Sequence, residues 1–142
     1  KGANIDAVGI NNKTSLIYAI KANNIELVEF LVTKGANINK VDSLGKTPLY
    51  YAFLYNLENI YYARNNPLKI VEFLIKKGAN LGNTNVNNIT IWGRPILFIV
   101  IRNQNLEIID FLIKNGADVN ESYGMEYPIE IAVDIESLEI LE

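Results

Sequence analysis

The sequence contains no cysteine and no histidine among its 142 residues. The absence of cysteine excludes disulfide bonds and thiolate chemistry, and the absence of histidine removes the most common general base and metal ligand. A Ser–His–Asp or Cys–His catalytic site therefore cannot be built, and neither can a zinc site of cysteine and histidine ligands.

Sequence signals for phosphate binding and for membranes are also missing. The chain has no glycine-rich dinucleotide or P-loop pattern, so nothing predicts a phosphate-binding loop. No apolar run approaches the ~20 residues of a membrane helix, and no charged segment followed by an apolar one indicates a signal peptide. We therefore expect a cytoplasmic protein without a membrane span.

Carboxylates recur along the chain at Glu26, Glu29, Glu72, Glu107 and Asp110. Paired carboxylates can act as acid and base, but a solvated helix face explains their regular placement better. We predict no enzyme activity, no cofactor and no metal site.

Positive charge is scarce near the end of the chain. All 13 lysines and arginines lie between Lys1 and Lys114, whereas half of the 16 acidic residues follow Lys114. Residues 1–115, with 13 basic and 8 acidic residues, carry +5, and residues 116–142 carry −8. A nucleic-acid-binding domain presents a continuous basic face, so this distribution argues against a nucleic-acid partner.

Repetition is the most prominent feature that the chain does have. Three near-copies of one phrase are IELVEFLVTKGANIN (25–39), LKIVEFLIKKGANLG (68–82) and LEIIDFLIKNGADVN (106–120). KGAN at the start and LEILE (138–142) at the end are interpreted as partial copies of the same repeat. One such repeat cannot bury its own apolar face, so we expect the repeats to stack.

The sequence pattern of each repeat predicts two helices. Apolar residues between Ile25 and Val32 fall at helical spacing, and Gly35 is expected to end that helix. Another helix is expected to begin at Thr47 and Pro48, because threonine caps free N–H groups and proline suits the first turn. Ala19 and Ala52 occupy matching positions, where small side chains let neighbouring helices approach closely.

The segments that open the repeats carry a family resemblance. They read TSLIYA (14–19), TPLYYA (47–52), PILFIV (95–100) and YPIEIA (127–132), and the recurring glycines are spaced by 33, 43 and 38 residues. Together with the Gly-Ala-Asn/Asp phrases, this resembles the ankyrin repeat, which has a period of ~33 residues, a β-turn finger and two helices. The signature histidine is replaced by Ile17, Tyr50, Phe98 and Glu130.

The resemblance covers the whole chain and implies an all-α fold. We expect one domain over residues 1–142, an ankyrin-repeat solenoid of about four helix-turn-helix repeats with hairpin fingers. The repeats are expected at 1–33, 34–76, 77–114 and 115–142, the last one truncated. The second has an insertion near 56–65, where its first helix is expected to continue to Asn65. The third has an insertion in its finger, within 81–92.

The resemblance also implies where a partner protein binds, namely on the finger tips and the exposed side of the first helices. Lys13, Lys46 and Arg94 occupy equivalent finger positions and are expected to form a row that suits an acidic segment of a partner. The alternative is that these cations only provide solubility. The other expected contact residues are Leu44, Trp92, Tyr123 and Met125 in the fingers, and Tyr55 and Arg102 on the helices.

Three features have alternative interpretations. Trp92 is either an exposed hot-spot residue or a clamp packed under its own finger. The tyrosines at 50, 51, 55, 61 and 62 either anchor a partner or cover the flank of a long helix, which we favour. The spacing Leu112–Asp118–Val119–Asn120 resembles a target of asparaginyl hydroxylases, although we favour a hairpin-stabilising role for Asn120.

The expected function is therefore that of a monomeric protein–protein interaction module whose partner is an unknown protein. Two other classes stay open. The chain could be the regulatory or targeting module of a longer enzyme, or a structural spacer that binds nothing.

Overall fold

The computed structural model describes residues 2–57 and 68–134. The chain divides into two compact units, unit 1 (Lys1–Thr84) and unit 2 (Asn85–Glu142). None of the described helices combines the length and the apolar character that a bilayer crossing requires.

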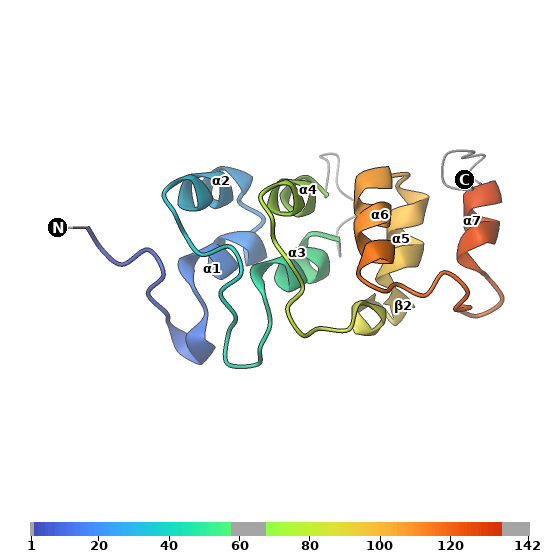
Figure 1. The fold of residues 1–142 in the computed structure, drawn as a ribbon, viewed down its shortest axis with the longest axis horizontal. Helices are drawn as coiled ribbons and strands as arrows, with labels where there is room; N and C mark the ends of the chain where they lie inside the picture. Colours follow the sequence, from blue (N-terminus) through green and yellow to red (C-terminus); the bar gives the residue numbers. More distant parts are fainter. Residues whose placement is uncertain (1, 58–67, 135–142) are drawn as a thin grey trace. The chain divides into compact units, whose positions relative to one another are not determined.

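Unit 1 consists of two helix pairs. The first pair is α1 (Ser15–Lys21) and α2 (Ile25–Thr33), and the second is α3 (Pro48–Leu57) and α4 (Lys69–Lys76). A short 3-10 turn, η1 (Ile10–Asn12), precedes α1. Helix α1 packs against α2 and α3, and α4 packs against α3 and α2. Figure 1 shows α1 and α3 in the lower layer of this unit and α2 and α4 in the upper layer.

The predicted start of α3 and the predicted end of α2 agree with the structure. The hydroxyl of Thr14 accepts a hydrogen bond from Ile17 N, and that of Thr47 accepts one from Tyr50 N, both at 3.3 Å. Gly35 follows α2 with a φ of +92°, a conformation that glycine adopts without steric cost. Ala19 and Ala52 are buried where α1 and α3 meet. The predicted capping, helix stop and close helix packing are therefore confirmed.

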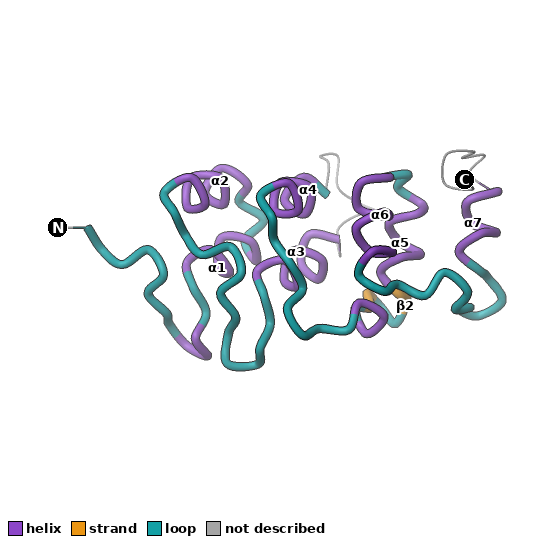
Figure 2. The backbone as a smooth tube through the Cα atoms, in the orientation of Figure 1, coloured by secondary structure: helices purple, strands orange, loops and turns teal. Residues whose placement is uncertain are grey.

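Unit 2 begins with a 3-10 turn and a small hairpin. The turn is η2 (Val86–Asn88), and the hairpin pairs β1 (Thr90–Ile91) with β2 (Arg94–Pro95) in antiparallel register, Ile91 opposite Arg94. Three helices follow, α5 (Ile96–Arg102), α6 (Leu106–Lys114) and α7 (Pro128–Asp134), and α5 packs against both others. In Figure 2 the strands are the orange segments, and the described secondary structure is otherwise helical.

The expected insertion after α3 lies mostly outside the described residues. Helix α3 is described to Leu57, so the expected continuation to Asn65 falls on residues 58–67. Helix α3 does pass the position where the equivalent helices stop. Asn23 and Gln104, which follow α1 and α5, have φ values of +51° and +55°, whereas the equivalent Asn56 lies inside α3.

The helical position of Asn56 has an energetic consequence. Its side chain is only 1% exposed, and no group in the described parts of the chain hydrogen-bonds its amide nitrogen or oxygen. A buried polar group without a partner costs about 1–3 kcal/mol. Asn56 is therefore a weak point of unit 1.

Candidate functional site

Four loops, which we call fingers 1 to 4, precede the helices α1, α3, α5 and α7. They comprise residues 2–14, 34–47, 77–95 and 115–127. Figure 2 shows finger 2, in unit 1, as a long teal loop that runs away from α2 and returns to α3.

The tips of fingers 3 and 4 are two-residue turns. In finger 3, Trp92 and Gly93 connect the paired residues Ile91 and Arg94, and both have positive φ, +51° and +77°. This is the type I′ geometry that fits a β-hairpin. In finger 4, Gly124 and Met125 connect Tyr123 to Glu126, which form an isolated β-bridge.

Each finger tip exposes one large apolar side chain. Ile10, Leu44, Trp92 and Met125 are 79%, 72%, 61% and 94% exposed. Leu44, Trp92 and Met125 are among the predicted contact residues, and Ile10 is added to them by its exposure. Because a clamp packed under its finger would be buried, the structure favours the exposed interpretation of Trp92.

The predicted row of cations is engaged by groups of the protein itself. The ammonium group of Lys13 lies 3.2 Å from Asp42 Oδ2 in finger 2. That of Lys46 lies 3.5 Å from Thr84 Oγ1 in finger 3, and Arg94 Nη2 lies 3.5 Å from Glu126 Oε2 in finger 4. Each cation thus contacts the finger of the following repeat, a tie between fingers that the sequence interpretation missed.

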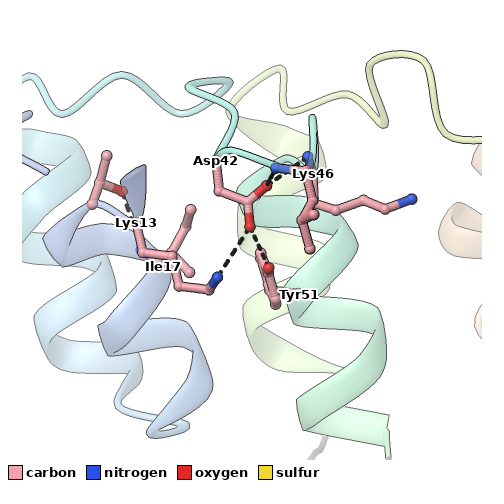
Figure 3. Close-up of polar contacts among 7 residues, drawn as sticks. Lys13, Ile17, Asp42, Lys46 and Tyr51 are labelled. Carbon is pink, nitrogen blue, oxygen red and sulfur yellow. Dashed lines mark hydrogen bonds and ion pairs between the residues drawn. The ribbon is translucent and has the colours of Figure 1, made fainter. Parts of the chain in front are cut away.

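The tie in unit 1 is a buried cluster, shown in Figure 3. Asp42 Oδ1 accepts hydrogen bonds from the backbone N–H groups of Leu44 and Lys46, at 2.9 and 3.0 Å. Its Oδ2 accepts one from the hydroxyl of Tyr51 and one from Lys13 Nζ. The side chain of Asp42 is 0% exposed and that of Lys13 only 12%. Ser43 N also donates to Asn11 O, which joins fingers 1 and 2 through their backbones.

These contacts shift the protonation equilibria of the cluster. Burial raises the pKa of Asp42, but the hydrogen bonds from Tyr51, from the two backbone N–H groups and from Lys13 outweigh it, so this pKa lies below its usual range. The contact with Tyr51, opposed by burial and supported by Asp42, raises the pKa of Lys13. Burial and the neighbouring carboxylate raise the pKa of Tyr51. The cluster is therefore a stable ion pair at neutral pH, and it holds the loop that carries Leu44.

The corresponding tie in unit 2 is exposed. The carboxylate of Glu126 forms ion pairs with Arg94 and with Arg102, whose Nη2 lies 3.2 Å from Oε1. The guanidinium of Arg94 lies over the ring of Tyr123, 5.2 Å from its centroid. The structure therefore brings Arg94 and Arg102, two predicted contact residues of unit 2, to one carboxylate, and it places a third, Tyr123, against Arg94. Trp92 and Met125 flank this group in the sequence.

The tyrosines of α3 form an aromatic surface with lysines. Tyr55 is 36% exposed and lies under Lys21 Nζ, 5.0 Å from the ring centroid. Tyr50 lies under Lys46 in the same way, at 4.5 Å, whereas Tyr51 is buried. Tyr61 and Tyr62 fall outside the described residues. Only part of the tyrosine cluster is thus available at the surface.

A second tie between repeats uses a side-chain amide. Asn39 Oδ1 accepts a hydrogen bond from Asn80 N, and Asn87 Oδ1 accepts one from Asp118 N, both at 2.9 Å. Asp6 Oδ1 does the same for Asn37 N. These residues can be recognised by their position in the sequence. Each lies eight residues before the residue that immediately precedes α1, α3 or α5.

The positions of the two asparagines also show how many residues are inserted in finger 3. Asn39 lies four residues after Gly35, whereas Asn87 lies nine residues after Gly78. Since the two asparagines make equivalent contacts, finger 3 has five extra residues between Gly78 and Asn87.

No described group of acidic residues is arranged to bind a metal ion, and the sequence offers no histidine or cysteine. What the site presents is a set of apolar finger tips beside engaged cations. Stacked pairs of short helices joined by finger-like loops define a repeat protein of the all-α class.

Comparison with known proteins identifies the family. The family model described as "Ankyrin repeats (3 copies)" matches residues 1–81 and 59–142, and this chain belongs to the ankyrin repeat family. It is 37% identical over 60 residues to the ankyrin repeat protein OPG189 of vaccinia virus (strain Copenhagen), and equally to those of monkeypox virus and variola virus. Each match covers 42% of this chain and 11% of the viral protein.

The family assignment confirms the expected all-α ankyrin-repeat solenoid class. Ankyrin repeats are generally protein–protein interaction modules and are typically not enzymes.

Proposed function

We propose that this chain recognises a partner protein through its finger tips, with Ile10, Leu44, Trp92 and Met125 as the principal contacts. The observation that carries the proposal is the exposure of one large apolar side chain at every finger tip. These side chains are largely exposed to water in the free protein, and the burial of such side chains in an interface contributes about 1.5–3 kcal/mol each. Large aromatic residues in particular are enriched at binding hot spots.

The backbone of Trp92 supports the same proposal. The first central position of a type I′ turn favours asparagine, aspartate or glycine, because its φ is positive. A bulky residue with φ of +51° is an outlier, at a cost of about 1–2 kcal/mol. An exposed side chain that costs stability indicates a role other than folding.

The acidic segment expected in the partner stays a prediction for the row as a whole. Lys13 is the weakest member of that row, because its charge is paired with the buried Asp42. Lys46 and Arg94 retain partial exposure and could assist binding at its edge.

The test is a quadruple variant in which Ile10, Leu44, Trp92 and Met125 are replaced by serine. Proteins captured from a cell extract are compared between this variant and the wild type by quantitative mass spectrometry. The affinity of any recovered partner is then measured by calorimetry with purified components. We expect the affinity to fall by more than about tenfold, because several hot-spot contacts are removed.

A matched control carries four serines on the outer helices, in place of Leu27, Phe30, Leu106 and Ile113, which are also exposed. It removes the same number of exposed apolar side chains from a different surface and should retain the partner. Equal binding by both quadruple variants would contradict the proposal. A wild-type chain that captures nothing beyond what the tip variant captures would instead support the spacer alternative.

A further inference from the structure

Two of the three basic residues of unit 2 converge on a single carboxylate. Arg102 Nη2 donates to Glu126 Oε1 and Oε2, at 3.2 and 3.4 Å, and Arg94 Nη2 lies 3.5 Å from Oε2. Unit 2 has three basic and ten acidic residues, a net charge of −7. Within this acidic unit, the group of Arg94, Arg102 and Glu126 is locally positive.

The arginine pair has more donors than Glu126 can use. Each guanidinium carries five N–H donors, and a carboxylate offers about four lone-pair sites in all. The side chains of Arg94, Arg102 and Glu126 are 27%, 36% and 42% exposed. Water and a partner can therefore reach all three groups.

Exposure also makes the contact with Glu126 easy to exchange. An exposed ion pair contributes about 0–1 kcal/mol, so removing Glu126 from the arginines costs little. The buried pair of Lys13 and Asp42 in unit 1 lacks this property, because Asp42 is enclosed and accepts four hydrogen bonds. Of these two described ties, the one in unit 2 combines convergent cations with access.

Apolar side chains stand next to this group along the chain. Trp92 precedes Arg94 by two residues, and Met125 immediately precedes Glu126; both are exposed finger-tip residues. A ligand that offers a carboxylate to the arginines therefore binds within one or two residues of two exposed apolar side chains. A free anion would contact only the arginines and not the apolar side chains.

We propose that Arg94 and Arg102 form a carboxylate-binding site that Glu126 occupies in the free chain. An aspartate or glutamate side chain of the partner protein, next to a large apolar residue, replaces Glu126 when the partner binds. The carboxylate of the partner forms ion pairs with Arg94 and Arg102, and the apolar residue next to it in the partner contacts Trp92 and Met125. This inference rests on the proposed function and adds the chemistry of the partner segment.

The experiment uses a displayed library of random twelve-residue peptides, selected in parallel on the wild type and on Glu126→Gln. Affinities of the selected peptides are measured by calorimetry for the wild type, Glu126→Gln and Arg102→Gln. The peptides should be rich in acidic residues beside large apolar ones. They should bind Glu126→Gln about threefold to fivefold more tightly than the wild type, since a competing ion pair is removed. They should bind Arg102→Gln about tenfold more weakly.

The sign of the Glu126→Gln effect separates the proposal from a structural role. If Glu126 only organised finger 4, its removal would weaken binding. Glu121→Gln is the control for net charge, because it removes one exposed acid from the same finger, and it should leave the affinity within about twofold.

Three results would overturn the proposal. They are unchanged or weaker binding by Glu126→Gln, equal binding of peptides whose acids are replaced by amides, and a selection that yields no binder on either protein. The double variant Trp92→Ser and Met125→Ser distinguishes this failure from that of the proposed function. If it abolishes peptide binding while the Glu126 and Arg102 variants have no effect, only the carboxylate site is wrong. If it binds normally, recognition by these finger tips is wrong as well.

Discussion

Lys13 in unit 1 and Arg94 in unit 2 occupy equivalent positions, and each contacts an acidic residue of the next finger. In unit 1 that acid, Asp42, is fully enclosed and saturated with hydrogen bonds. In unit 2 that acid, Glu126, is 42% exposed. The comparison shows that burial of the partner acid decides whether an equivalent cation stabilises the fold or stays accessible to a ligand.

The two units also differ in net charge. Unit 1 has ten basic and six acidic residues, a net charge of +4, whereas unit 2 carries −7. Three of these cations, Lys13, Lys21 and Lys46, nevertheless lie against tyrosines, and Lys13 also pairs with Asp42. Net charge therefore does not reveal which unit offers cations to a partner.

The largest expected effect tests this difference directly. Asp42→Ala should lower the free energy of unfolding by about 3 kcal/mol, because it leaves Lys13 and Tyr51 without their buried partner. Glu126→Ala should lower it by less than about 1 kcal/mol, because its ion pairs are exposed. Urea unfolding followed by circular dichroism measures both. Similar losses in the two variants would invalidate the distinction between a buried and an exposed tie.

The buried cluster of Lys13, Asp42 and Tyr51 in unit 1 should make the stability of the protein depend on pH. The folded-state pKa of Asp42 lies below the unfolded value of 3.8, so its contribution is complete above about pH 4 and is lost as pH falls through the folded pKa. At the alkaline end, the raised pKa values of Lys13 and Tyr51 mean that stability is lost as pH rises beyond about 10. The urea midpoint should therefore decline at both ends of the range.

The variant Asp42→Asn identifies the source of the acid decline. It removes the titrating carboxylate and should make the urea midpoint less dependent on pH below about pH 4. An acid decline as steep as that of the wild type would show that other carboxylates cause it.

A smaller effect is expected at the equivalent residues Asn56 and Gln104. Asn56→Leu should raise the free energy of unfolding by about 1 kcal/mol, because it replaces a buried amide that has no partner among the described residues. Gln104→Leu should not stabilise, because Gln104 is exposed at a positive φ beyond α5. Thermal unfolding of the two variants checks this contrast. A gain for Gln104→Leu equal to that for Asn56→Leu would point to a general effect of hydrophobicity.

The smallest stability effect concerns the finger tips. Trp92→Asn should raise stability by about 0.5–1 kcal/mol, since asparagine adopts positive φ more readily. Leu44→Asn in finger 2 should change stability by less than about 0.5 kcal/mol, as expected for an exposed substitution. Calorimetric melting temperatures measure both changes. If Trp92→Asn is destabilising, Trp92 contributes to packing and its proposed role in recognition is weakened.

Predictions from local patterns agreed well with the structure. The cap at Thr47, the stop at Gly35 and the burial of Ala19 and Ala52 all follow from interactions within a few residues or from small size. The site was predicted only in part. Leu44 and Met125 lie exposed at finger tips, and Trp92 agrees with the exposed one of its two interpretations, whereas Lys13 is enclosed by Asp42, which is distant in the sequence.

The sequence by itself determined the class of fold, because repetition, helical periodicity and capping act locally and recur in every copy. The resemblance of the repeats to the ankyrin repeat also indicated which residues lie in the fingers. Only the tertiary structure decided which cations are committed to internal partners, which asparagines join successive repeats, and which carboxylate is accessible. Those outcomes depend on distances and burial between residues about 24–41 positions apart.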